Sequence, residues 1–240
     1  FRGVHEASGL DTDGTTTGQL CGAGVVAMTF FNDLKAQCST EWHAYTHHPF
    51  VRGLADGSLP EAAFRHYLKQ DYLFLIQFAR AYALAGYKAR SMEDLYRAKE
   101  GMQAILDIEL DLHRKYCKKW GITLADLERE PEATPTMAYT RYVLERGMAG
   151  NLLDLYVALS PCILGYGEIG LAHSPASPDN PYADWIAMYS GSDYQKACRE
   201  TRLYLDDLAG SALSVSRRTE LAKTFSQATR LEIDFWQMGL

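Results

Sequence analysis

The sequence predicts an all-α protein, folded as a compact bundle of eight or more helices. From Phe30 onward, apolar residues recur at three- and four-residue spacings almost throughout, which is the periodicity of helices with one buried face. No run of valine, isoleucine or threonine alternates with period two for long enough to indicate a sheet. The links between the helical segments are short, which favours a bundle.

The N-terminal segment differs from the rest of the chain. Residues 1–27 are rich in glycine, threonine and aspartate and lack periodicity. We expect them to form an N-terminal extension or leader, with Met28 as a candidate natural start. Residues 28–240 are long enough to bury a large core, and nothing in them demands a second domain, so a single domain is predicted.

The first predicted helix covers residues 29–45 and ends before the segment HHPF, because Pro49 disfavours helical backbone at the residue before it. Ser58 and Glu61 have the spacing of a capping box. They predict a long helix that reaches about residue 90. Another helix is predicted over residues 91–120.

A short helix is predicted over residues 123–128, and the segment PEATP separates it from a helix that begins near Thr136. The segment HSPASPDNP at 173–181 is predicted to be a loop, since its three prolines cannot continue a helix. Ser192 with Gln195 is expected to cap the penultimate helix. The last helix is expected over residues 216–238.

The central stretch, residues 151–170, places a cysteine on the inward face of an apolar helical pattern; this face holds Leu152, Leu155, Leu159, Cys162 and Tyr166. Pro161 either kinks a continuous helix or begins a new one capped by Ser160. The second arrangement would put Cys162 in a first turn, where free N–H groups favour a thiolate. On these residues alone, Cys162 is either a reactive centre or, as most intracellular cysteines are, a small buried hydrophobe.

Composition excludes several classes of function. The net charge of −6 and the pI near 5.6 argue against a nucleic-acid partner, which needs a basic face. No stretch approaches the roughly 20 apolar residues of a membrane span, and no signal peptide is evident, so we expect a cytoplasmic protein without a membrane partner. The five cysteines are odd in number, widely spaced and without a C-x-x-C pair, which predicts neither a disulfide framework nor a zinc site.

Two carboxylates lie on apolar helical faces. Asp71 shares its face with aromatic residues from Phe64 to Tyr82, and it needs either a structural hydrogen-bond donor or a ligand as partner. Glu232 lies on the inward face of the last helix, between Phe225 and Phe235. Enclosure by apolar surface would raise the pKa of Glu232 and suit it to donate a proton near neutral pH, unless it forms a buried pair with another polar group.

The tyrosines outnumber the phenylalanines, at 15 against nine. Four of them either line a pocket for a flat ring or only pack in the core: Tyr139, Tyr142, Tyr166 and Tyr189. Two metal sites were considered and neither is expected. Glu109 and His113 lack the spacing and the second copy of a di-iron motif. The adjacent His47 and His48 are more typical of a helix cap and a surface residue.

Several motifs occur in one order along the chain: HHPFVRGLADGSLPEAAFRHYLKQDYLFLIQFAR, TPTMAYTRYVL, LLDLYVALSPCILGYGEIG, WIAMYSG and LEIDFW. Together they resemble the TenA family of thiaminase II and aminopyrimidine aminohydrolases, from about Phe30 to Met238. The resemblance implies an all-α fold of the haem-oxygenase-like type, a homotetramer, and no metal or organic cofactor. It also implies a small-molecule aminopyrimidine or thiamine as the binding partner.

The resemblance implies hydrolysis that releases 4-amino-5-hydroxymethyl-2-methylpyrimidine from the corresponding aminomethylpyrimidine, which is thiamine salvage, or from thiamine. The PC-x-x-x-Y motif places the nucleophile on Cys162 and a pocket tyrosine on Tyr166. The QD motif places the pyrimidine-binding aspartate on Asp71, and E-x-x-FW places the proton donor on Glu232.

Further site residues follow from the same resemblance. Tyr139 and Tyr189 match ring-contacting tyrosines of the family. Phe74 stands where some members carry a tyrosine near the thiol, and it can stack on a ring but cannot donate a hydrogen bond to sulfur. Activation of the thiol would then depend on other groups.

Two other functions were weighed. A haem-degrading oxygenase would need an axial histidine facing the pocket, and the sequence offers no good candidate on a central apolar face. A non-catalytic pyrimidine- or thiamine-binding protein, or a regulatory one, would use the same helical bundle. The occurrence of two unusual residues in the sequence, Cys162 and Glu232, favours catalysis.

Overall fold

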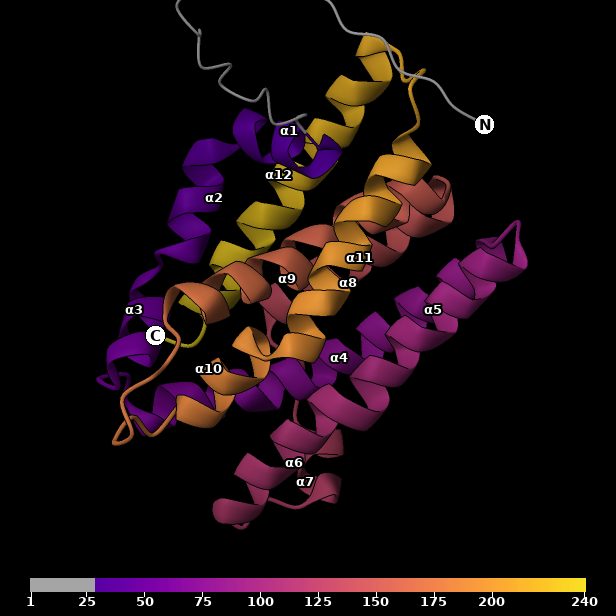
Figure 1. Ribbon diagram of the computed structural model, residues 1–240. Helices are drawn as coiled ribbons and strands as arrows, with labels where there is room; N and C mark the ends of the chain where they lie inside the picture. Colours follow the sequence, from indigo (N-terminus) through magenta and orange to yellow (C-terminus); the bar gives the residue numbers. More distant parts are fainter. Residues whose placement is uncertain (1–28) are drawn as a thin grey trace, which may run out of the picture.

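The computed structural model describes residues 29–240, and every regular element within that range is helical (Figure 1). The predicted extension over residues 1–27 lies outside the described residues. The helices are α1 (Phe30–Gln37), α2 (Ser39–Thr46), α3 (Pro49–Asp56), α4 (Glu61–Lys88), α5 (Met92–Ala104), the π-helical segment η1 (Ile105–Glu109), α6 (Leu110–Lys119), α7 (Leu124–Arg129), α8 (Thr134–Ala149), α9 (Leu152–Ala172), α10 (Ala183–Ser190), α11 (Ser192–Ala209) and α12 (Val215–Gln237). The prediction of an all-α bundle is confirmed.

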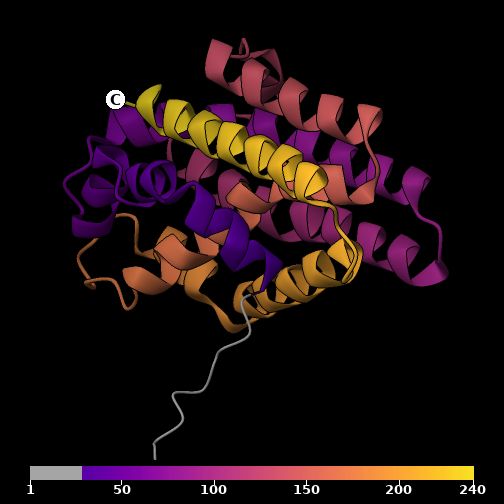
Figure 2. The ribbon, with the colours of Figure 1, turned by 90° about the horizontal axis from the view of Figure 1, so that it is seen from above.

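Helix α9 forms the centre of the bundle. It is buried on almost every side, as expected for a helix that is apolar all round. It packs against α8, α10, α11 and α12, which surround it in both ribbon views (Figures 1 and 2). Side chains on α9 therefore face the interior whichever way they point.

Pro161 lies inside α9, which is continuous from Leu152 to Ala172. The interpretation in which Ser160 caps a new helix is therefore wrong: the Ser160 hydroxyl donates to the carbonyl of Val157 at 2.9 Å instead. The true cap is Asn151, which forms a capping box with Asp154 at the start of α9. Cys162 is consequently in the middle of the helix, far from the free N–H groups of its first turn.

Two predicted capping boxes are also wrong. Pro60 is the N-cap of α4, and the backbone N–H of Ser58 donates instead to Asp56. Gly191 is the N-cap of α11. The Gln195 side chain, one turn into that helix, donates to the carbonyls of Gly167 and Tyr189. A tertiary contact between helices has taken the place of the local cap.

Two predicted helices are divided in the structure. The one over residues 29–45 breaks at Cys38 into α1 and α2. The one over residues 91–120 is interrupted by η1, whose wider turn changes the direction in which the following residues project. Helices α3 and α10, which flank the predicted HHPF break and the loop at 173–181, were not predicted.

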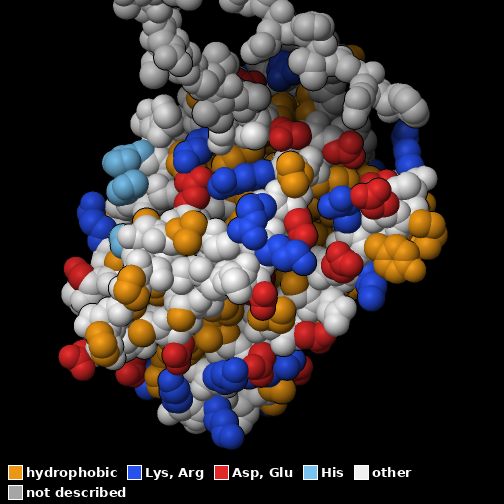
Figure 3. All heavy atoms as spheres, viewed as in Figure 1, with side chains coloured by type: hydrophobic (Ala, Val, Ile, Leu, Met, Phe, Trp, Pro, Cys, Tyr) orange, Lys and Arg blue, Asp and Glu red, His pale blue; other side chains and the backbone are white. Residues whose placement is uncertain are grey.

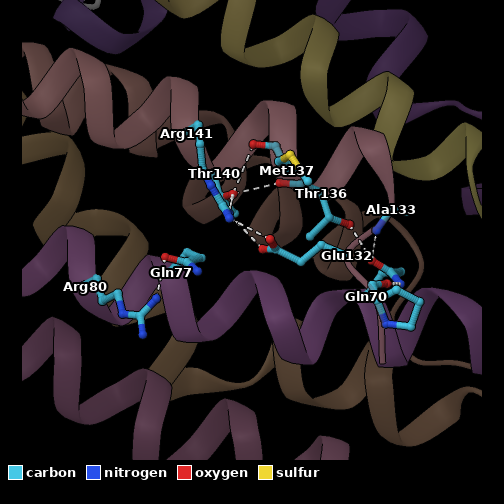
Figure 4. Close-up of polar contacts among 10 residues, drawn as sticks. Gln70, Gln77, Arg80, Glu132, Ala133, Thr136, Met137, Thr140 and Arg141 are labelled. Carbon is cyan, nitrogen blue, oxygen red and sulfur yellow. Dashed lines mark hydrogen bonds and ion pairs between the residues drawn. The ribbon is translucent and has the colours of Figure 1, made fainter. Parts of the chain in front are cut away.

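A buried glutamine fixes α8 on α4 (Figure 4). The Gln70 Oε1 atom accepts from the backbone N–H of Ala133 at 2.9 Å and from the Thr136 hydroxyl at 2.8 Å. Its Nε2 atom donates to the carbonyl of Pro131 at 3.0 Å. These three bonds satisfy the amide and set the position of the first turn of α8 beside the helix that carries Asp71.

Helix α9 is long and apolar enough to cross a membrane by length and composition, but 83% of its most apolar window is buried inside the fold. The expectation that no stretch approaches those criteria is therefore wrong. The burial is that of a core helix.

Close packing of α10 on α9 depends on Gly170. A Cβ atom at Gly170 would lie 2.6 Å from the backbone carbonyl carbon of Tyr189, so we expect Gly170→Ala to destabilise the protein by about 1–3 kcal/mol in spite of alanine's better helix propensity. Thermal unfolding measures this. The control Gly86→Ala, where a Cβ would meet no atom closer than 3.6 Å, should leave stability unchanged or raise it. Equal effects of the two substitutions would contradict the packing argument.

Candidate active site

Three of the predicted residues meet on one side of α9. Cys162 projects from α9 toward α12, where Glu232 lies on the buried face together with Phe225 and Phe235, as its spacing predicts. The Tyr139 hydroxyl, from α8, donates to Glu232 Oε1 at 2.9 Å. The Cys162 thiol lies beside the same carboxyl. Three helices thus bring a thiol, a carboxyl and a phenol together.

Burial controls the protonation of this group. It raises the pKa of Glu232 to about 8, against the lowering effect of the Tyr139 hydrogen bond. Burial also raises the pKa of the Cys162 thiol well above its usual range, and the neighbouring Glu232, Glu109 and Asp71 raise it further. The thiol and the Glu232 carboxyl therefore both hold their protons near neutral pH. Cys162 is not a preformed thiolate, contrary to the helix-terminus interpretation.

Asp71 has structural partners that the sequence did not indicate. Its Oδ2 atom accepts from the Tyr67 hydroxyl at 3.0 Å and pairs with His113 Nε2 at 2.7 Å. The other ring nitrogen of His113 bonds the carbonyl of Glu109 at 2.8 Å, which requires that nitrogen to donate. Complete burial by itself would lower the pKa of His113. The hydrogen bonds and charges of Asp71 and Glu109 outweigh that effect, so the pKa is raised. His113 and Asp71 thus form a buried ion pair.

One oxygen of Asp71 remains available. Both protein partners use Oδ2, and within residues 29–240 no side chain or backbone group donates to Oδ1. The prediction that Asp71 faces where the aromatic residues face is confirmed by its burial among them. Oδ1 is therefore an acceptor without a protein donor among the described residues, in a carboxyl that His113 already holds through Oδ2.

Tyr166 and Tyr189 continue the cluster. The Tyr166 hydroxyl lies 3.5 Å from that of Tyr67, and its ring packs on the ring of Tyr189 at a centroid distance of 5.0 Å. The Tyr189 hydroxyl donates to Glu109 Oε2 at 3.3 Å. Burial, followed by the charge of Asp71, raises the pKa of Glu109 to about 7.

Phe74 forms an aromatic wall between these groups. Its ring packs against Tyr139 at 5.0 Å and against Phe235 at 5.3 Å. It supplies no hydrogen-bonding group, in line with the sequence. Tyr142 lies apart from the cluster: it is partly exposed, and its hydroxyl donates to the carbonyl of Thr224. Of the four tyrosines considered, it is the one that does not join the site.

A cavity of about 620 Å³ reaches the cluster from the side of η1, α10 and α11. Its lining includes the buried Cys162 and the partly buried Glu109, together with apolar side chains such as Phe78, Tyr82 and Met188. The other six predicted site residues are buried and do not belong to the cavity wall. The thiol is therefore the junction between an open cavity and a buried polar cluster.

The histidines do not form a metal centre in the described part of the chain. Within residues 29–240, no three His, Cys, Asp or Glu side chains gather in a way that would hold a metal ion. His48 caps α3 through its Nδ1 atom, and His47 is exposed, as the sequence indicated.

Sequence reasoning missed four members of the cluster. Tyr67 and Trp185 donate within the hydrogen-bond network, His113 pairs with Asp71, and Glu109 lines the cavity. The signal in the sequence is the spacing of Glu109 and His113, which places both side chains one helical turn apart. Their real partners come from α4 and α10, which local spacing does not reveal.

Comparison with known proteins identifies a family that this chain matches. The model of the TENA/THI-4/PQQC family matches residues 35–240. An aminopyrimidine aminohydrolase from Halalkalibacterium halodurans is 37% identical over 215 residues, which cover 88% of this chain and 96% of that protein. A crystal structure from Silicibacter sp., described as a TenA family transcription regulator, superposes with a TM-score of 0.83 at 44% identity, over 88% of this chain and 96% of that one.

The fold type is confirmed by a more distant structure. A domain of unknown function from Shewanella denitrificans, described as having a heme oxygenase-like fold, superposes with a TM-score of 0.67 at 14% identity. It covers 87% of this chain and 91% of that one. At this identity the likeness concerns the fold alone.

The protonated state of Glu232 predicts how stability depends on pH. Between its usual pKa of 4.5 and its folded value of about 8, the unfolded chain loses a proton that the folded protein keeps. Stability should fall as pH rises through this window, by about 1.4 kcal/mol per pH unit at most from this group. Glu232→Gln, which cannot ionise, should lose less stability over the same window.

Urea unfolding at several pH values measures this difference. The control Glu220→Gln alters an exposed residue of the same helix and should keep the wild-type dependence. Parallel pH dependences for the wild type and Glu232→Gln would contradict a protonated, buried Glu232.

Proposed function

The chain belongs to the TENA/THI-4/PQQC family, and on that premise we propose that it hydrolyses 4-amino-5-aminomethyl-2-methylpyrimidine to 4-amino-5-hydroxymethyl-2-methylpyrimidine and ammonia, a reaction of thiamine salvage. The 37%-identical relative named aminopyrimidine aminohydrolase supports this activity. The observation that carries the proposal is the placement of the Cys162 thiol beside the protonated Glu232 carboxyl, in the lining of a cavity. Thiamine, which carries the same pyrimidine, is the proposed second substrate.

The pyrimidine is held by its polar edge. Asp71 Oδ1, which has no protein donor among the described residues, accepts from the exocyclic amino group of the ring. The rings of Phe74, Tyr139, Tyr166 and Tyr189 supply aromatic surface on which the pyrimidine stacks. This orientation presents one ring carbon to Cys162 and one ring nitrogen to Glu232.

Covalent addition then breaks the aromaticity of the ring. Sulfur bonds to the ring carbon next to the one that bears the methylene, while Glu232 gives its proton to the ring nitrogen and takes the proton of the thiol. This exchange conserves charge, so it avoids a free thiolate, which burial disfavours. Since Phe74 cannot hydrogen-bond sulfur, Glu232 is the activating group.

The electron-rich adduct expels the substituent. The bond from the methylene carbon to the leaving nitrogen breaks, and its electron pair departs with that nitrogen. Water adds through its oxygen to the exocyclic methylene and releases one proton to the departing amine or to solvent. The carbon–sulfur bond then breaks with its electron pair on sulfur; Glu232 gives its proton to that sulfur and takes the proton of the ring nitrogen as aromaticity is restored. The net reaction consumes one water and forms one alcohol and one amine, with Cys162 and Glu232 regenerated.

A regulatory or purely binding role is the alternative. The structure from Silicibacter sp. that is 44% identical is described as a transcription regulator. The net charge of −6 disfavours direct binding to nucleic acid, and a thiol next to an acid has no evident use in a protein that only binds. The family resemblance also leads us to propose a cytoplasmic homotetramer, which light scattering after size-exclusion chromatography tests.

The decisive assay compares steady-state hydrolysis of the aminomethylpyrimidine and of thiamine. We expect the aminomethylpyrimidine to be consumed faster, and Cys162→Ala to reduce kcat by about 10³-fold or more while binding of the hydroxymethyl product changes little. Cys117→Ala removes another buried thiol, on α6, and should retain wild-type activity.

Each alternative gives a different result. An active Cys162→Ala enzyme would disprove the covalent step. A wild type that binds the pyrimidine without consuming either substrate would establish the binding role instead.

A further inference from the structure

One carboxyl of the site takes no part in the reaction as described. Glu109 is the last residue of η1, and it lines the cavity together with Cys162. Within the described residues, the only hydrogen bond to its carboxyl comes from the Tyr189 hydroxyl, which donates to Oε2 at 3.3 Å. It is close enough to Cys162 for its charge to raise the pKa of the thiol. Glu109 and Cys162 therefore line one cavity, close enough for their charges to interact.

Glu109 differs from the other charged residues that line the cavity. The other acidic residues of the lining, Glu100, Asp193 and Glu200, are exposed, whereas Glu109 is partly buried. Both basic residues of the lining face other carboxylates: Arg97 pairs with Glu93 at 2.7 Å, and Lys196 lies 3.7 Å from Glu200.

No ion pair of residues 29–240 includes Glu109, and the nearby His113 is taken by Asp71. On the face of the molecule drawn in Figure 3, basic side chains are interspersed with acidic ones. A partly buried carboxyl that forms no ion pair is a site for a cationic group that enters through the cavity.

The proposed reaction supplies such a group. With the pyrimidine edge on Asp71 and the ring at Cys162, the substituent on the methylene points away from the buried cluster and toward the cavity. Near neutral pH a primary alkylamine is an ammonium ion, and in thiamine the same position carries a positively charged thiazolium nitrogen. The product carries a neutral hydroxyl there. A carboxylate at this place therefore distinguishes both substrates from the product.

We infer that Glu109 binds the leaving group: its carboxylate holds the ammonium of the aminomethylpyrimidine, and the Tyr189 hydroxyl orients that carboxylate. This inference rests on the proposed function. As the carbon–nitrogen bond breaks, its electron pair goes to nitrogen and the ammonium departs as ammonia into the cavity. The ion pair with Glu109 is lost once the hydroxymethyl product has formed, so Glu109 adds affinity for the substrate only.

Glu109→Gln tests this inference, because it keeps the size and hydrogen-bonding capacity of the side chain and removes the charge. We expect kcat/KM for the aminomethylpyrimidine to fall by about 100-fold, the effect of removing one partner of a desolvated ion pair. The Kd of the hydroxymethyl product, measured by calorimetry, should stay within about 3-fold of the wild-type value.

Two further variants test whether the effect of Glu109→Gln depends on the position and on the charge of the carboxylate. Glu100→Gln removes an exposed carboxylate of the same cavity and should change kcat/KM by less than about 2-fold. Glu109→Asp keeps the charge and should retain more of the kcat/KM than Glu109→Gln does.

The outcomes separate this inference from the function on which it depends. A Glu109→Gln enzyme with wild-type kcat/KM would overturn the leaving-group role. Equal losses in substrate turnover and product binding would overturn it too, because they indicate a structural role. A failure of the proposed function appears in the wild type itself, as an absence of turnover for both substrates.

Discussion

Burial of ionisable groups around one helix is the constraint on which this structure depends. Cys162, Glu232, Asp71 and Glu109 lie within reach of one another's charge, yet within residues 29–240 one histidine is the only cation that pairs with any of them. Four negative charges in that volume would be prohibitively costly. The cluster is stable because Asp71 is neutralised by its histidine, while burial keeps protons on the thiol and raises the pKa of the two glutamates.

Tyrosine hydroxyl groups and close packing of the helices stabilise these buried carboxyl groups. Each carboxyl of the cluster receives a tyrosine hydroxyl: Tyr139 donates to Glu232, Tyr67 to Asp71 and Tyr189 to Glu109. These tyrosines come from three different helices, α8, α4 and α10, all of which pack on α9. The glycines of α9 permit that approach, since a Cβ at Gly170 would overlap the backbone of α10.

The same arrangement gives the site two chemically different sides. On the buried side, hydrogen-bond donors and acceptors are fixed by packing, which suits recognition of a flat polar ring. On the cavity side, the walls are largely apolar and include an unpaired carboxyl. The Cys162 thiol lies where the two sides meet, so a ring held on the buried side can have its substituent on the cavity side.

The sequence by itself determined the helical class and the inward faces that carry Asp71, Cys162 and Glu232, because a period of 3.6 residues is a local property and apolar faces must be buried. It did not determine the partners of those residues. The pairing of Asp71 with His113, the approach of Glu109 to Cys162 through a π-helical turn, and the continuity of α9 through Pro161 were decided by the tertiary structure. Each depends on contacts between helices far apart in the chain, which override local capping and breaking signals once the core is packed.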